Sequence, residues 1–159
     1  MRDRTAVPTR STRRRFLFGA AGLAIAPMAV SERARATPES MKAAIKRVVG
    51  EASLQTGRIK LDLPPLVENG NAVPLAVSVE SPMTVKDHVK AIHIFTEKNP
   101  QPNVASFHIG PRTGKASVST RIRLADTQQV IAVAAMSDGS FWTDSVEVVI
   151  TLSACMEDM

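Results

Sequence analysis

The 159-residue sequence contains a single cysteine, Cys155, and four residues follow it. One cysteine excludes a disulfide bond within the chain. Four roles stay open for its thiol: a free reactive group, a link to a second chain, a metal ligand or a buried inert residue. The segment after it, MEDM, contains two acids in a stretch that is expected to fray. We therefore favour an accessible thiol on a short tail over a buried one.

The sequence also lacks the short motifs of hydrolases and nucleotide-binding enzymes. It contains no G-x-S-x-G elbow, no H-E-x-x-H zinc motif and no P-loop. Asp87 and His88 are neighbours in the sequence, but such adjacency does not build a catalytic triad. The carboxylates are scattered singly, so no general acid and base pair can be named. We expect a protein that is not an enzyme by itself and that needs no cofactor.

The first 36 residues have the pattern of an export signal. The run TRRRFL, with Arg13 and Arg14, fits the twin-arginine motif except that Phe18 replaces the usual lysine after it. The apolar stretch 16–30 is short and rich in Gly, Ala and Pro, which disfavours a membrane anchor. The triplet 34–36, Ala-Arg-Ala, offers small residues to a signal peptidase. We expect cleavage after Ala36 and localisation in the periplasm.

Excess positive charge is confined to this leader. The whole chain has 20 Lys and Arg against 15 Asp and Glu, and eight of the basic residues precede Thr37. From Thr37 onwards the counts are 12 basic and 13 acidic residues. The exported part therefore has no basic patch for nucleic acid or an anionic membrane, and we expect neither as a partner.

Hydrophobic periodicity predicts one short helix and six β-strands. The helix covers residues 38–50, with a proline in its first turn and Gly50 as its stop. The segment 57–74 is rich in Pro, Gly and Asn and is expected to form turns. One helix face is apolar: Met41, Ala44, Ile45, Val48 and Val49. The expected strands are 73–80, 90–97, 103–109, 115–124, 128–136 and 145–152.

These strands alternate apolar and polar residues, which is typical of antiparallel sheets with one wet face. In 115–124, for example, Val118, Thr120 and Ile122 alternate with polar residues. Six such strands at about ten-residue spacing, separated by turn residues, predict a β-sandwich. The length from Thr37 onwards suits one domain with a modest core.

A β-sandwich with a cysteine and a methionine near its end raises the alternative of a blue-copper protein. Such sites take two histidines, a cysteine and often an axial methionine. The chain has His88, His93 and His108, but no histidine follows Cys155 as it does in those proteins. We predict that the histidines are strand-face or surface residues and that no metal site is present.

A rigid domain with one thiol on a tail suggests a covalent carrier, because a tail can bring its sulfur into the active site of another protein. Five segments then form a distinctive set. With the sequence around them, about residues 38–152, they resemble SoxY, the sulfur-carrier subunit of the bacterial thiosulfate-oxidising (Sox) system. The segments are ENGNAVP (68–74), SPMT…DHVKAIHIF (81–95), NPQP (99–102), STRIRLA (119–125) and MSDGS (136–140).

The resemblance implies an all-β, immunoglobulin-like sandwich after a short N-terminal helix, paired with a SoxZ subunit. It implies that Cys155, which matches the carrier cysteine by position, holds sulfur covalently. A SoxAX-type cytochrome would attach thiosulfate, a SoxB-type hydrolase would release sulfate, and a sulfane dehydrogenase would oxidise the remaining sulfur. The expected organisation is a signal peptide (1–36), a sandwich domain (37–152) and a flexible carrier arm (153–159).

The tail departs from the family pattern. SoxY proteins end in G-G-C-G-G, whereas this sequence has SACMEDM. Glycine gives backbone freedom without side-chain bulk, and Met156 and Glu157 are bulkier. Acids beside Cys155 also disfavour its thiolate and raise the pKa of the thiol. Two alternatives follow: a carrier with an altered arm, or a SoxY-fold binding module that pairs with a SoxZ-like subunit without carrying sulfur.

Overall fold

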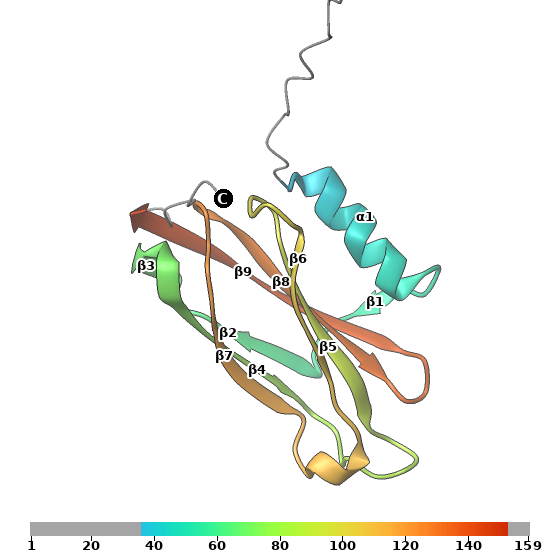
Figure 1. The fold of residues 1–159 in the computed structure, drawn as a ribbon. Helices are drawn as coiled ribbons and strands as arrows, with labels where there is room; N and C mark the ends of the chain where they lie inside the picture. The colour runs from blue at the N-terminus through green and yellow to red at the C-terminus, as the bar shows by residue number, and fades with distance from the viewer. Residues whose placement is uncertain (1–35, 153–159) are drawn as a thin grey trace, which may run out of the picture. The chain divides into compact units, whose positions relative to one another are not determined.

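A computed structural model describes residues 36–152, which form two β-sheets and one α-helix (Figure 1). The predicted signal motif, Arg13 and Arg14, and the predicted arm, 153–159, lie outside the described residues. Within 36–152 no helix is long and apolar enough to cross a membrane.

Helix α1 (Pro38–Val49) begins and ends as its sequence predicts. Thr37 and Ser40 form a reciprocal capping box, in which each side chain accepts a hydrogen bond from the other residue's backbone N–H. Gly50 ends the helix with a φ of 65°, a value that favours glycine. Four of the five predicted apolar residues are buried, and Val48 is half-buried: the buried four are Met41, Ala44, Ile45 and Val49.

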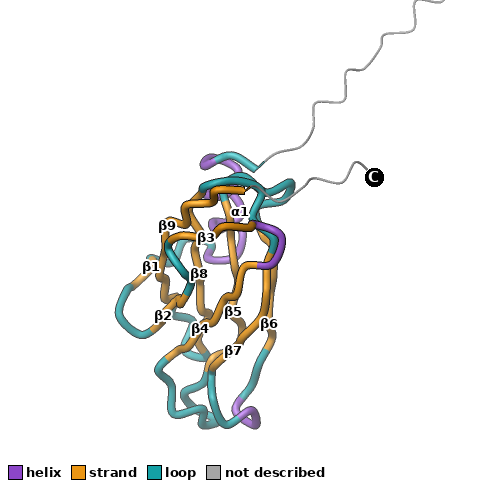
Figure 2. The backbone as a smooth tube through the Cα atoms, turned by 90° about the vertical axis from the view of Figure 1, so that its left-hand side faces the viewer, coloured by secondary structure: helices purple, strands orange, loops and turns teal. Residues whose placement is uncertain are grey.

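The strands form a larger and a smaller sheet. In the larger sheet the order is β1-β9-β8-β5-β6, with β3 also paired to β9, and in the smaller sheet it is β2-β4-β7. Short 3₁₀ turns, η1 (Gly70–Ala72) and η2 (Pro111–Thr113), precede β4 and β7. Figure 2 shows the strands running between loops that gather at the two ends of the domain. The bounds are β1 Leu54–Gln55, β2 Ile59–Asp62, β3 Leu66–Asn69, β4 Val73–Val79, β5 Val89–Thr96, β6 Asn103–His108, β7 Ser117–Ile122, β8 Gln128–Met136 and β9 Phe141–Leu152.

The main core lies between the two sheets, and a second apolar cluster lies under the helix. Inward residues of β4, such as Leu75 and Val77, pack in one cluster with Ile92 of the larger sheet. On the outer face of the larger sheet, Phe95 and Val133 pack against α1. The alternation predicted for β4 and β7 is thus confirmed, because their apolar residues turn inward and their polar residues outward. The result is the predicted immunoglobulin-like β-sandwich with an N-terminal helix.

Six strands were predicted, but the described residues contain nine, because β1, β2 and β3 were not predicted. The segment 57–74 holds strands β2 and β3 as well as turns, and β9 begins at Phe141 rather than at residue 145. β2 is four residues long and is followed closely by two prolines. Its alternation of apolar and polar residues is therefore too short to predict a strand. β1 and β3 pair with β9 in parallel, within an otherwise antiparallel pattern. Within the described residues, both of these short strands pair only with β9.

Candidate carrier site

Strand β9 is the root of the predicted carrier arm. It has 12 residues: Phe141–Val148 pair with β8, and Val149–Leu152 pair with β3. On one edge, Val148 lies opposite Gln128 of β8. On the other edge, Leu152 lies opposite Asn69 of β3. Figure 1 shows β3 beside the end of β9. Pairing with β8 and then with β3 gives the predicted arm a fixed starting point.

Side chains strengthen this attachment. Thr127, just before β8, accepts a hydrogen bond from the backbone N–H of Ile150 through Oγ1 at 2.9 Å. Thr151 donates through its hydroxyl to the carbonyl of Glu68 in β3 at 3.1 Å. The backbone N–H of Val149 donates to the carbonyl of Pro65 at 2.8 Å. Because the neighbouring residue 148 is a fully buried valine, the root is fixed by both hydrogen bonds and core packing.

The position of the root limits where the thiol can go. Cys155 lies outside the described residues, three positions beyond Leu152. Since an extended chain spans at most about 3.5 Å per residue, the Cα of Cys155 stays within about 11 Å of the Cα of Leu152. Leu152, the last described residue before the predicted arm, lies at the end of the sandwich formed by η1, the start of β4 and the loop 123–127.

A buried asparagine joins the loops at this end. The side chain of Asn99 accepts hydrogen bonds from the backbone N–H of Ala125 at 3.0 Å and from Gln128 Nε2 at 3.1 Å. It donates through Nδ2 to the carbonyl of Arg123 at 2.8 Å. Nearby, the carbonyl at position 70 accepts from the backbone N–H of Leu124 at 2.9 Å. The loop after β7 is thus tied to both the β5–β6 turn and η1.

The five segments that carried the resemblance gather at two ends of the fold. The segments 68–74, 99–102 and 119–125 meet through the bonds just described, beside the root of the arm. At the opposite end, the other two segments are joined by Ser137, whose hydroxyl accepts from the N–H of His88 and donates to the carbonyl of Lys86. Three of the five segments therefore lie beside the end of β9.

The histidines lie away from this end or on strand faces. His93 of β5 and His108 of β6 have ring centroids 6.1 Å apart, and His93 Nδ1 lies 2.8 Å from the hydroxyl of Ser106. Burial lowers the pKa of His93, and the neighbouring His108 lowers it further. Among residues 36–152 no three of His, Cys, Asp and Glu come together as metal ligands would.

The adjacent pair Asp87 and His88 is not a catalytic dyad in the structure. Asp87 forms a salt bridge with Arg58, at 3.4 Å between Nη2 and Oδ2. The ring of His88 instead contacts the backbone carbonyl of Thr84, with Nδ1 at 3.1 Å. The two side chains have different partners, so neither orients the other as a triad requires.

Sequence reasoning missed the groups that hold the root of the arm. Thr127 and Asn99 lie in predicted turns, where Thr and Asn are common for local reasons. A polar residue flanked by apolar strands was the only signal available. Their partners are 23 to 29 positions away in the sequence.

Comparison with known proteins places this fold in a family. The model of the SoxY family, described as sulfur oxidation protein SoxY, matches residues 45–155, a range that ends at Cys155. The structure of the sulfur carrier protein SoxY from Chlorobium limicola f thiosulfatophilum is 32% identical, with a TM-score of 0.60. That match covers 72% of this chain and 98% of the Chlorobium chain. No curated protein matches the chain.

More distant structures share the fold alone. A superoxide reductase (neelaredoxin) from Ignicoccus hospitalis is 16% identical, with a TM-score of 0.53, over 72% of this chain and 94% of its own. A putative superoxide reductase from Thermotoga maritima is 19% identical, with a TM-score of 0.52, over 61% and 93%. The identity to the Chlorobium carrier, 32%, is higher than the identity to either reductase, and the family model matches residues 45–155. These two findings show that this chain belongs to the SoxY family of sulfur oxidation proteins.

Proposed function

We propose that the chain is a periplasmic sulfur carrier of thiosulfate oxidation, holding sulfur intermediates covalently on Cys155. One observation carries the proposal: strand β9, paired first with β8 and then with β3, ends three residues before Cys155, and the family match also ends at that residue. A fixed root and a short tail let a thiol leave the domain surface while its starting point stays defined. The role of sulfur-oxidation carrier belongs to the family as a whole.

The chemistry on Cys155 takes two balanced steps. In the first, the thiol and thiosulfate form an S–S bond, releasing one proton and two electrons; a c-type cytochrome of the SoxAX type accepts the electrons. The product is a cysteine S-thiosulfonate. In the second, water cleaves the bond between the outer sulfur and the sulfonate, releasing sulfate and two protons and leaving a persulfide anion on Cys155. A SoxB-type hydrolase supplies this step, and a sulfane dehydrogenase oxidises the remaining sulfur.

The chain contributes presentation and not catalysis in this scheme. Cys155 must form its nucleophilic thiolate, and the segment around it must enter the active site of each partner. Family membership implies Sox partner proteins, and we propose a stable heterodimer with a SoxZ-like subunit. The enzymes would then meet the arm only transiently, because each must release it to the next.

Export by the twin-arginine pathway is part of the proposal, with cleavage after Ala36. In the structure Ala36 is buried, and its backbone N–H donates to the carbonyl of Asn99 at 2.7 Å. Cleavage there would remove this contact and make Thr37 the first residue, within the capping box of α1. N-terminal sequencing of the protein from a periplasmic fraction tests both the compartment and the cleavage position.

Mass spectrometry tests the carrier role. The protein is incubated with thiosulfate and its cognate Sox enzymes, and the expected result is a thiosulfonate or persulfide on Cys155. The Cys155→Ser variant is the control and should gain no mass. The proposal fails if Cys155 gains nothing while a relative with a G-G-C-G-G tail is modified in the same mixture.

A second candidate function rests on the altered tail. The residues Met156 and Glu157, where the family has glycines, favour a binding module that pairs with a SoxZ-like subunit without carrying sulfur. In that case Cys155→Ser should leave both pairing and growth on thiosulfate unchanged. Growth that collapses in the Cys155→Ser strain while pairing persists eliminates the binding module.

A further inference from the structure

Two arginines lie on the outer side of the sandwich near the root of the arm. Arg121 is in β7, where it lies opposite Pro74 of β4, and Arg123 follows the strand. Both are exposed. Arg121 is on the outward face of β7, and Arg123, just after the strand, lines the same groove as Arg121. Neither forms a salt bridge with any residue in 36–152.

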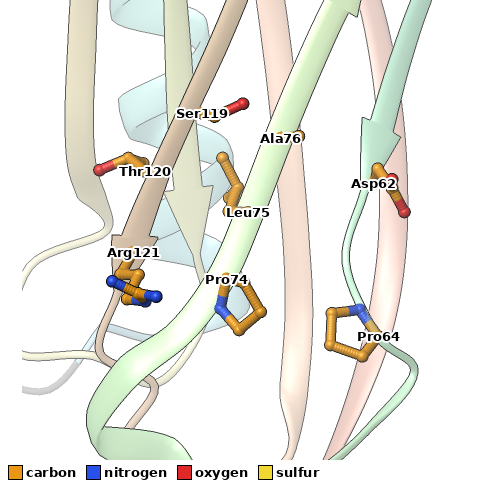
Figure 3. A pocket seen from close by; sticks show the side chains of 8 residues that line it. All are labelled: Asp62, Pro64, Pro74, Leu75, Ala76, Ser119, Thr120 and Arg121. Atoms are coloured by element: carbon orange, nitrogen blue, oxygen red, sulfur yellow. The ribbon is translucent and has the colours of Figure 1, made fainter.

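Arg121 borders two grooves. One, of about 690 Å³, crosses the outer face of the smaller sheet and is lined by Pro64 and Pro74 as well as by Arg121. Figure 3 shows Arg121, Pro74 and Pro64 in a row across this face, with Asp62 near Pro64 at the far end of the row. The second groove, of about 650 Å³, lies between β6 and β7 and contains both Arg121 and Arg123. Pro64 and Pro74 therefore share the first groove with Arg121, and Pro100 shares the second groove with Arg121 and Arg123. Neither arginine has a salt-bridge partner within 36–152.

We propose that the C-terminal segment of this chain, Met156–Met159, docks on this surface, with Glu157 and Asp158 paired to Arg121 and Arg123. The segment combines two acids with two methionines. The surface combines Arg121, Pro64 and Pro74 in one groove with Arg121, Arg123 and Pro100 in the other. Flexible methionine side chains pack well on irregular apolar surfaces such as proline rings. Docking would hold Cys155 near the domain until a partner displaces the tail.

The length of the tail allows this contact. Leu152 lies opposite Asn69. The residue after Asn69 is Gly70, whose carbonyl accepts a hydrogen bond from the N–H of Leu124, the residue that follows Arg123. From strand spacings and consecutive Cα distances, this path from Leu152 to Arg123 is at most about 18 Å. Five residues beyond Leu152, the Cα of Glu157 reaches up to about 17 Å, and the side chains add several ångströms. The tail is therefore long enough for its acids to reach Arg123, and Arg121 is two residues before it, in β7.

Two features favour the chain's own tail over another occupant. The tail starts at this end of the fold, so its local concentration at the grooves is set by a tether of a few residues. Its two acids also match the two arginines in number and are opposite to them in charge. One group opposes docking: Asp62 borders the same groove as Arg121 and would repel the acids of the tail.

The rate of alkylation of Cys155 by iodoacetamide, a neutral reagent, measures whether the tail is docked. For the purified full chain and its variants, the rate is followed across pH to obtain the limiting rate of the thiolate. We expect Arg121→Gln/Arg123→Gln to raise this limiting rate by about three- to fivefold, the size expected for two exposed ion pairs. Loss of nearby cations by itself would disfavour the thiolate and slow the reaction at neutral pH, so undocking has the opposite sign.

The tail supplies the second half of the test. Glu157→Gln/Asp158→Asn should raise the limiting rate by the same factor, and combining all four substitutions should add nothing, because one interaction is removed from both sides. Asp62→Asn should lower the rate, since it removes a competing acid. Added salt should bring the wild-type rate towards that of the variants.

Arg112→Gln is the matched control. Arg112 is also an exposed arginine, but it lies in η2, which precedes β7 at the end of the sandwich far from Leu152. An equal rate change in that variant, or no change in Arg121→Gln/Arg123→Gln, overturns the proposal. Analytical sedimentation of the wild type and the arginine variants measures whether a second copy of the chain occupies this surface instead. A dimer that dissociates on substitution, with unchanged alkylation, would assign the surface to a second copy and also overturn the proposal. The test involves no sulfur transfer, so it is independent of whether Cys155 is a carrier.

Discussion

Asp144 of β9 accepts a hydrogen bond from the backbone N–H of Leu61 in β2, with 2.8 Å between Oδ2 and N. The two strands belong to different sheets, so this carboxylate joins the sheets where no ladder hydrogen bond can. Its other oxygen, Oδ1, accepts from the backbone N–H of Ser145 at 2.8 Å. The strand that leads to the arm is therefore attached to the smaller sheet.

Replacing Asp144 with alanine should destabilise the domain. The substitution leaves the N–H of Leu61 without its partner in a half-buried position, which typically costs about 1–3 kcal/mol. Urea unfolding measures the free energy of unfolding. Glu147→Ala, an exposed acid on the same strand, is the control and should change it by no more than about 0.5 kcal/mol. Equal losses in both variants would show that the effect comes from charge and not from the link.

Asn99→Ala should be more harmful, because one buried side chain satisfies three groups. The variant removes bonds to Ala125, Gln128 and Arg123 and leaves buried polar atoms unpaired. We expect a loss of about 2–4 kcal/mol in the free energy of unfolding. The exposed Asn103 provides a matched control, since Asn103→Ala loses only a side-chain contact with the hydroxyl of residue 106.

Hydrogen exchange gives the site-specific result for Asn99→Ala. The amide of Leu124 should exchange faster in this variant, because the loop after β7 loses its tie to the β5–β6 turn. Unchanged protection of Leu124, together with unchanged stability, would mean that Asn99 does not organise the end of the sandwich near the arm.

The elements with a sustained period could be predicted from sequence. In β4, the stretch 73–79 alternates over seven residues, and in α1 the spacing of Met41, Ala44 and Ile45 covers more than one turn. β3 could not be predicted, because its residues are mostly exposed and it exists through pairing with β9. Local pattern reports which face is buried, but it does not report a partner strand 83 positions away.

The candidate site also has one part that the sequence predicts and one part that only the structure reveals. Cys155 was identified by its being the single cysteine and by the resemblance, and neither required a structure. The surface around Arg121 required one, because Pro64 and Pro74 come together with it only when three strands align. In the sequence, Arg121 and Arg123 read simply as the wet face of an alternating strand.

His93 should make stability depend on pH. Burial lowers its pKa in the folded state, and the ring of His108 lies beside it. As the pH falls through about 6.5, the ordinary value, the unfolded chain takes up the proton first. The free energy of unfolding should therefore fall from about pH 6.5 down to the lowered pKa and then level off. His93→Gln should remove this contribution, as measured by urea unfolding across this range of pH.

A direct titration of His93 measures its pKa separately from the pH effects of other ionisable groups. NMR of the ring Cε1–H in the wild type should give a midpoint for His93 below the ordinary value, since burial disfavours the charged imidazolium. A midpoint at or above the ordinary value would contradict this assignment, whatever the overall dependence of stability on pH.

In the proposed carrier reaction, side-chain bulk beside the thiol should limit how well the arm enters the active site of a partner. Met156 directly follows Cys155, where family members have glycine, and a glycine offers more backbone freedom and no side chain. We expect Met156→Gly to raise kcat/KM severalfold when the cognate cytochrome couples thiosulfate to the protein. Met159→Gly is the matched control, because it removes the same side chain four residues from the thiol and should have less effect. A larger gain from Met159→Gly, or none from Met156→Gly, would show that side-chain size next to Cys155 does not limit the entry of the arm.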